Sequence, residues 1–64
     1  MIRIETRRGD NISVAQVDTT YENAINFLIR ETGGSVVSIE PDSCTIYSGT
    51  WHFTITKVKE SSYS

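Results

Sequence analysis

The sequence is poor in the side chains that build covalent, metal and catalytic sites. Its 64 residues include one cysteine, Cys44, and one histidine, His52. A single cysteine excludes an intramolecular disulfide, and with it the small secreted proteins that disulfides hold together. One histidine and one cysteine also fall short of the four ligands of a structural zinc site. We therefore expect no metal ion and no cofactor.

Long apolar runs are also absent. The longest run is far shorter than the roughly 20 residues that a membrane-spanning helix needs. Met1 leads directly into the segment IRIE, without the basic and apolar stretches of a signal peptide. These absences predict a cytoplasmic protein that does not enter a membrane.

Neither sign of charge dominates the chain. Six Lys and Arg residues stand against eight Asp and Glu residues, which gives a net charge of −2. A sequence-independent DNA binder usually has a clear basic excess, and a DNA mimic has a much larger acidic one. Sixty-four residues also make one domain near the lower size limit for folding alone, so a partner or a second copy can matter to its stability.

Period-two alternation predicts strands at both ends of the chain. The segments MIRIETRR (1–8) and ISVAQV (12–17) flank GDN (9–11), a turn sequence, and predict an antiparallel hairpin. The segments SVVSIE (35–40), CTIYS (44–48) and WHFTITKV (51–58) predict three more strands, joined by the turns PDS and GT.

Between these strands the apolar spacing becomes helical. Residues 20–32 place Tyr21, Ala24, Ile25 and Leu28 on one face of a helix. Thr19 and Glu22 have the spacing of a capping box, and Gly33 predicts the left-handed C-terminal cap.

The order strand-strand-helix-strand-strand-strand predicts an α+β fold, with one helix packed on one face of a four- to five-stranded antiparallel sheet. Residues 1–59 would form this domain and residues 60–64 a flexible polar tail. Trp51 is the largest predicted core residue, and its replacement by alanine should cost about 3–5 kcal/mol. The predicted core is Ile2, Ile4, Ile12, Val14, Ile25, Leu28, Val37, Ile39, Ile46, Trp51, Phe53 and Ile55.

A single helix cannot cover two faces of a sheet, so one face is left open. This face is either plainly solvated, a recognition surface, or an interface with a second copy through the face or a sheet edge. Arginine and tyrosine are common anchors of protein interfaces. We therefore assign partner binding to Arg3, Arg7, Tyr47, His52 and Thr54. The alternation also places Glu5, Ser13, Ala15, Val36, Ser38, Thr45, Thr56 and Val58 on the open face.

No set of residues in the sequence supports catalysis. His52 would need a nucleophile or an orienting carboxylate, and Glu5 is the one carboxylate on the same face. Cys44 falls on the inward face, where a free cysteine behaves as a small apolar residue. The segment TGGS (32–35) follows a helix and lacks the spacing of a phosphate loop, so it predicts a cap. The sequence favours a protein that is not an enzyme.

Nucleic-acid binding is the alternative function. If the first and last strands are neighbours, their basic residues form a local patch despite the negative total, and Tyr47 and His52 can stack on bases. The aromatic motif of RNA-recognition sheets is missing. The basic residues of the patch are Arg3, Arg7, Arg8, Lys57 and Lys59.

In size and element order, the chain resembles small phage-encoded proteins of the anti-CRISPR type. The resemblance is carried by the segment VDTTYENAINFL after the first hairpin and by VVSIE and GTWHFTI in the closing strands. It implies an inhibitor in the host cytoplasm that binds a bacterial protein or complex and occludes its surface without chemistry. It assigns a role to no individual residue.

Overall fold

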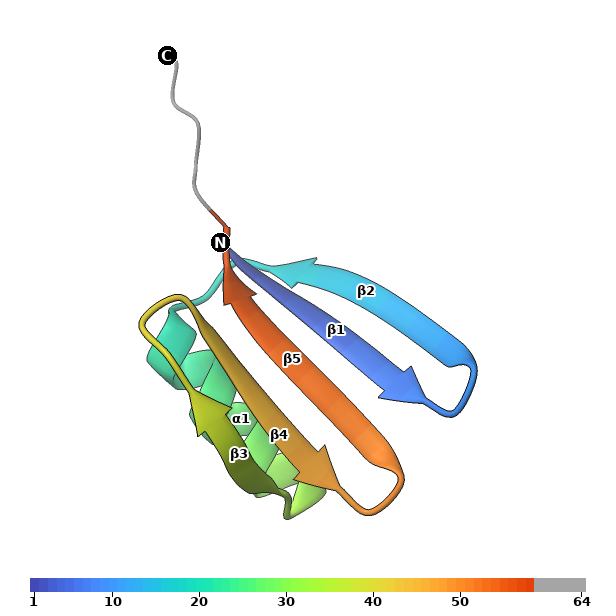
Figure 1. Cartoon of the computed structure of the whole chain (residues 1–64). Coiled ribbons are helices and arrows are strands. Elements are labelled where there is room, and N and C mark those ends of the chain that lie inside the picture. The colour runs from blue at the N-terminus through green and yellow to red at the C-terminus, as the bar shows by residue number, and fades with distance from the viewer. Residues whose placement is uncertain (59–64) are drawn as a thin grey trace.

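The structure is a computed structural model and describes residues 1–58, so Lys59 and the predicted tail, residues 60–64, lie outside the described residues. One five-stranded antiparallel sheet has the order β2-β1-β5-β4-β3, and a single helix lies on one of its faces (Figure 1). The predicted α+β fold and its element order are confirmed. The elements are β1 (Ile2–Arg8), β2 (Asn11–Val17), α1 (Tyr21–Thr32), β3 (Ser35–Ile39), β4 (Ser43–Ser48) and β5 (Trp51–Lys57).

The first hairpin turns in two residues, not in the three that the segment GDN suggested. Arg8 pairs with Asn11, so that only Gly9 and Asp10 remain in the turn. Gly9 has a φ of 59°, which fits a type II′ turn with glycine at its first central position. The shorter turn pairs even-numbered residues of β1 with odd-numbered residues of β2. Every side chain of β2 therefore points to the face opposite to the one that we predicted.

The helix begins one residue later than predicted. Thr20, not Thr19, is the N-cap, and its side chain accepts a hydrogen bond of 3.1 Å from the backbone N–H of Asn23. The predicted capping box between Thr19 and Glu22 is thus wrong, because a cap at Thr20 places Glu22 one position too early for it. The predicted cap at Gly33 is confirmed, with a φ of 66° and a backbone bond of 2.9 Å to the carbonyl of Ile29.

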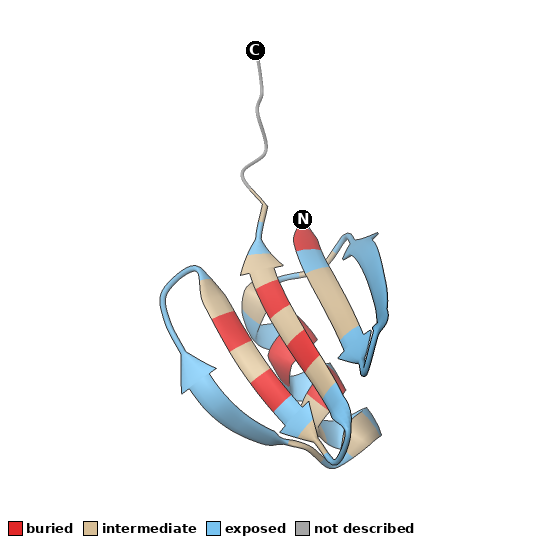
Figure 2. Ribbon diagram, turned by 45° about the vertical axis from the view of Figure 1, so that its right-hand side comes forward, coloured by how far each residue is buried: buried red, intermediate tan, exposed pale blue. Residues whose placement is uncertain are grey.

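The core lies where α1 crosses β4 and β5. Ile46 and Ile55 are completely buried, and α1 supplies its predicted face, with Tyr21 and Ile29 packed at the margin. Figure 2 shows the buried bands on these two strands and on the start of β1. The buried apolar residues are Ile2, Ala24, Ile25, Leu28, Cys44, Ile46, Phe53 and Ile55.

Five of the predicted core residues are exposed instead. Ile12 and Val14 are 56% and 50% exposed because the two-residue turn moves them to the open face. Val37 is exposed because the pairing of β3 with β4 shifts between Val36 and Ser38, as in a β-bulge. Ile39 lies at the end of the edge strand β3 and is 64% exposed. Trp51 faces the helix side at the end of β5 and is 40% exposed, so the loss of about 3–5 kcal/mol expected for a core tryptophan is too large.

Gly34 allows β3 to start close to β4. A Cβ atom on Gly34 would lie 2.8 Å from the backbone oxygen of Tyr47 and 2.9 Å from a side-chain carbon of Ile46. Distances this short leave no room for a side chain. Gly34 therefore permits the close approach of the start of β3 to β4.

Candidate functional site

The open face carries a row of paired side chains that crosses the whole sheet. From β2 to β3, Ile12 is opposite Arg7, Arg7 is opposite His52, His52 is opposite Tyr47, and Tyr47 is opposite Ser35. This face is turned toward the viewer in Figure 1, with the helix behind the sheet. The row brings together three of the five residues that the sequence predicted for partner binding.

Tyr47 and His52 form the centre of this row. Their ring centroids are 4.0 Å apart and the ring planes differ by 13°, so the two rings are stacked. Tyr47 is 43% exposed, which leaves much of its ring available to a partner. The second hairpin produces this pair because Gly49 and Thr50 form a two-residue turn, as predicted, and place the two residues opposite each other.

A second row runs beside the first and is mostly small and polar. It consists of Val14, Glu5, Thr54, Thr45 and Ser38, paired in that order from β2 to β3. Thr54, the fourth predicted binding residue, is half-buried between its neighbours. The short side chains in this row make the middle of the face flat.

Arg3, the fifth predicted binding residue, lies in a third row, opposite Gln16 and Thr56. Arg3 and Arg7 flank Glu5 on β1, so the two guanidinium groups outnumber the carboxylate of this strand. Among the residues that the structure describes, none of these three side chains forms an ion pair. Their charges are thus available to a partner.

The predicted basic patch is divided between the two faces. β1 and β5 are neighbours, as that prediction required. However, Arg8 lies on the helix side, with its Cζ 5.0 Å from the ring centroid of Trp51. Lys57 lies on the same side, with its Nζ 5.1 Å from the ring centroid of Tyr21. The alternation of side chains along each strand separates both residues from Arg3 and Arg7.

Three further residues lie on the wrong face in the sequence-based assignment. Ser13 and Ala15 were expected on the open face but lie on the helix side, because the two-residue turn exchanges the faces of β2. Val36 pairs with the buried Ile46 and lies on the helix side as well. The signal that reveals Ile12 and Val14 on the open face is the Gly-Asp dipeptide, a typical two-residue hairpin turn.

The groups that a catalytic site needs do not converge on His52. Glu5 pairs with Thr54 and makes no hydrogen bond to the imidazole in the described part of the chain. Residues 1–58 also contain no group of three or more His, Cys, Asp or Glu side chains placed to hold a metal ion. Burial raises the pKa of the Cys44 thiol above its usual value, which favours the thiol over the nucleophilic thiolate.

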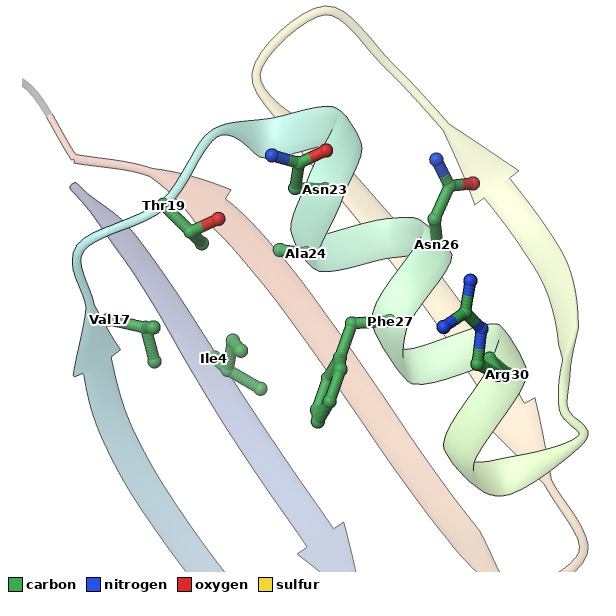
Figure 3. Close-up of a pocket in the computed structure, with 8 residues that line it drawn as sticks. All are labelled: Ile4, Val17, Thr19, Asn23, Ala24, Asn26, Phe27 and Arg30. Atoms are coloured by element: carbon green, nitrogen blue, oxygen red, sulfur yellow. The ribbon is translucent and has the colours of Figure 1, made fainter.

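The helix side of the sheet has a groove that sequence reasoning missed. It lies between α1 and the first hairpin, has a volume of about 490 Å³, and is walled by Phe27, which is 58% exposed (Figure 3). The sequence feature that could have indicated this groove is Phe27, an aromatic residue outside the predicted apolar face of the helix. The lining residues are Ile4, Val17, Thr19, Asn23, Ala24, Asn26, Phe27 and Arg30.

No protein-family model matches the chain, and comparison with curated proteins and with solved structures also found no match. Within residues 1–58, no helix has the length and the apolar character needed to cross a membrane. The site is therefore interpreted from its own geometry.

Proposed function

We propose that this protein is a non-enzymatic binding module that uses the open sheet face to occlude the surface of a partner protein. The observation that carries the proposal is the row of Ile12, Arg7, His52 and Tyr47 across an uncovered sheet. It combines arginine and tyrosine, two residue types enriched at energetically important interface positions, with exposed aliphatic surface.

The exposed Ile12 and Val14 favour a protein partner over a nucleic acid. They add an aliphatic margin beside Arg7 and Glu5, on the same face as Tyr47. Such a margin fits an apolar patch on another protein, whereas a phosphate backbone needs cations. The removal of Arg8 and Lys57 to the other face leaves two cations beside one carboxylate, which weakens the case for nucleic acid.

The chemistry of the face also describes the partner. Arg3 and Arg7 would pair with carboxylates of the partner. The Tyr47–His52 stack and Ile12 would pack against an apolar or aromatic surface that lies between those carboxylates. The resemblance to small phage-encoded proteins of the anti-CRISPR type supports a bacterial protein or complex as this partner. Binding would act by covering a substrate site or by holding one conformation of the target.

The test starts with the immobilised full-length chain and a bacterial lysate, followed by reconstitution with each purified candidate protein. Calorimetry then compares the wild type with Arg7→Ala and with the double variant Tyr47→Ala/His52→Ala. Arg30→Ala is the matched control, because Arg30 is an exposed arginine on the helix. We expect both face variants to weaken binding at least tenfold and the control to leave it unchanged.

Equal affinity of the wild type and the double variant would refute this use of the face. A gel shift with single-stranded RNA and DNA at about 50 and 200 mM salt distinguishes the alternative. Binding to nucleic acid that weakens with salt and is lost in Arg7→Ala would replace the protein partner by a nucleic acid.

A further inference from the structure

The two edges of the sheet differ in their protection against pairing with another chain. β3 has five residues and an irregular pairing between Val36 and Ser38, and Pro41 follows shortly after its end. Short strands, bulges and nearby prolines are the usual features that block an edge. β2 has seven residues and a regular pairing to β1, and every one of its residues is exposed (Figure 2).

The sequence of β2, NISVAQV, contains no charged residue and no proline. Lysine, proline and inward-pointing charges are the features by which native sheets keep such an edge from pairing. A long, regular and uncharged edge strand is therefore available for hydrogen bonding to another strand. The absence of charge also removes like-charge repulsion between two copies of this strand.

The backbone groups that face the free edge belong to Ile12, Val14 and Gln16. The backbone N–H of Val58 donates to the carbonyl of Met1, and these two residues, directly beside the ends of β5 and β1, are a hydrogen-bonded pair in the same register as that ladder. Hydrogen-bonded pairs alternate along an antiparallel ladder, so the even-numbered residues of β1 bond to β2. The even-numbered residues of β1 bond to the odd-numbered residues of β2, so the even-numbered residues of β2 have no backbone partner within residues 1–58.

We propose that β2 pairs with β2 of a second copy of this chain, antiparallel and centred on Val14. In this register Val14 is opposite Val14 of the second copy, and Ile12 is opposite Gln16. These are the residues with free backbone groups, and about six hydrogen bonds form in the three pairs. A register centred one residue away leaves some of these groups unpaired. The strand is thus complementary to itself, as a two-fold interface requires.

The proposed dimer goes beyond the proposed function and leaves the open face accessible. The two-fold axis runs perpendicular to the sheet, so both helices lie on one side and both open faces on the other. The doubled sheet then presents two copies of the row containing Arg7 and Tyr47. Self-association depends on the free backbone groups of β2, whereas partner binding is tested at the side chains of Arg7, Tyr47 and His52 on β1, β4 and β5, so the two proposals can fail independently.

Asp10 and Asp18 flank β2 and approach their counterparts in the second copy, since Asp10 extends the register to Asp18. Their repulsion should be weaker at higher salt. An interface of one strand edge is small, and we expect a dissociation constant on the order of micromolar to hundreds of micromolar. Salt should tighten the dimer, in contrast to the weakening expected for nucleic-acid binding.

Sedimentation velocity over a concentration range from about 10 µM to 1 mM measures the dimer. Val14→Lys places two ammonium groups opposite each other at the two-fold axis and should raise the dissociation constant at least tenfold. Mixing Val14→Lys with Val14→Glu should restore a dimer between the two variants. Val37→Lys is the matched control, because Val37 on the other edge strand is a valine of similar exposure, 56% against 50% for Val14.

Amide hydrogen exchange tests the register directly. In the dimer, the amides of Ile12, Val14 and Gln16 should become protected as concentration rises, while those of Ser13 and Ala15 are protected at every concentration by β1. A Val14 N-methyl chain, assembled by ligation at Cys44, removes one edge donor without touching the β1–β2 ladder and should be monomeric. Circular dichroism confirms that each variant is folded.

A monomer at every concentration overturns the proposal. It is also overturned by a dimer that Val14→Lys does not weaken, by equal weakening in Val37→Lys, or by a dimer whose even-numbered β2 amides stay unprotected. Loss in Val14→Lys, recovery on mixing and alternating protection together establish the pairing.

Discussion

Replacing isoleucine by valine at four positions tests the assignment of the two sheet faces. Ile46 and Ile55 are 0% exposed, whereas Ile12 and Ile39 are 56% and 64% exposed. Each substitution removes one methylene group, so the four variants differ only in the surroundings of that group. Differences in the loss of stability between the four variants therefore report how deeply each methylene group is buried.

The expected losses follow from these exposures. Ile→Val at a buried position costs about 0.5–1.5 kcal/mol, since the methylene loses its contacts and leaves a cavity. At Ile12 and Ile39 we expect changes within about 0.5 kcal/mol. A chain of this size has a total stability of roughly 3–10 kcal/mol at 0.05–0.15 kcal/mol per residue. The buried variants should therefore remain folded, and their losses can be measured.

Urea unfolding followed by far-ultraviolet circular dichroism and by Trp51 fluorescence gives the free energy of unfolding. A constant slope against urea shows that the variants unfold from the same compact state. Each titration is repeated at a tenfold higher protein concentration, because Ile12 lies on the edge proposed for self-association. If Ile12→Val loses as much stability as Ile46→Val, then Ile12 faces the helix and the two-residue turn is wrong.

Three more outcomes follow from local geometry. Gly34→Ala should lose about 1–3 kcal/mol in urea unfolding, because the new Cβ overlaps the backbone of β4; a neutral effect would show that β3 starts farther from β4. Thr20→Ala should lose about 1 kcal/mol and Thr19→Ala almost nothing, since only Thr20 caps the helix; the reverse order would restore the capping box. Burial, the leading cause in both cases, raises the pKa values of Tyr21 and Cys44 above 10.0 and 9.0. The folded state thus holds these protons more tightly, so the contribution of these two groups to the free energy of unfolding should be constant below about pH 9 and fall above it. Tyr21→Phe should reduce that fall, and stability that rises with pH in this range would contradict the assignment.

The second hairpin was predictable because its turn has a clear length. Gly49 and Thr50 stand between two alternating runs and leave one possible register, which places Tyr47 opposite His52. The helix was predictable to within one residue, since its apolar face and its terminal Gly33 are both written in local spacing. These features depend on neighbours in the sequence.

The first hairpin was not predictable from alternation alone. Asparagine is a common turn residue, so the segment GDN fits either a three-residue turn that includes Asn11 or a two-residue turn with Asn11 in the strand. The pairing of Arg8 with Asn11 and the positive φ of Gly9 decide between them, and the signal for this outcome in the sequence is the Gly-Asp dipeptide. The irregular pairing of β3 was not predictable either, because it depends on contacts with β4 and not on local composition.

One residue of turn length changes what the open face is able to bind. With a three-residue turn, Ile12 and Val14 would lie on the helix side of the sheet, and the open face would carry Ser13 and Ala15 beside Arg7. The two-residue turn puts aliphatic side chains next to the arginine and the aromatic stack, and it brings the small residues to the helix side. Ile12 and Val14 are not part of the buried core, which is formed by α1, β4, β5 and Ile2 of β1. Side chains that the core does not use remain available for interfaces, and in this chain they gather on β2 and on the row that leads from it to Tyr47.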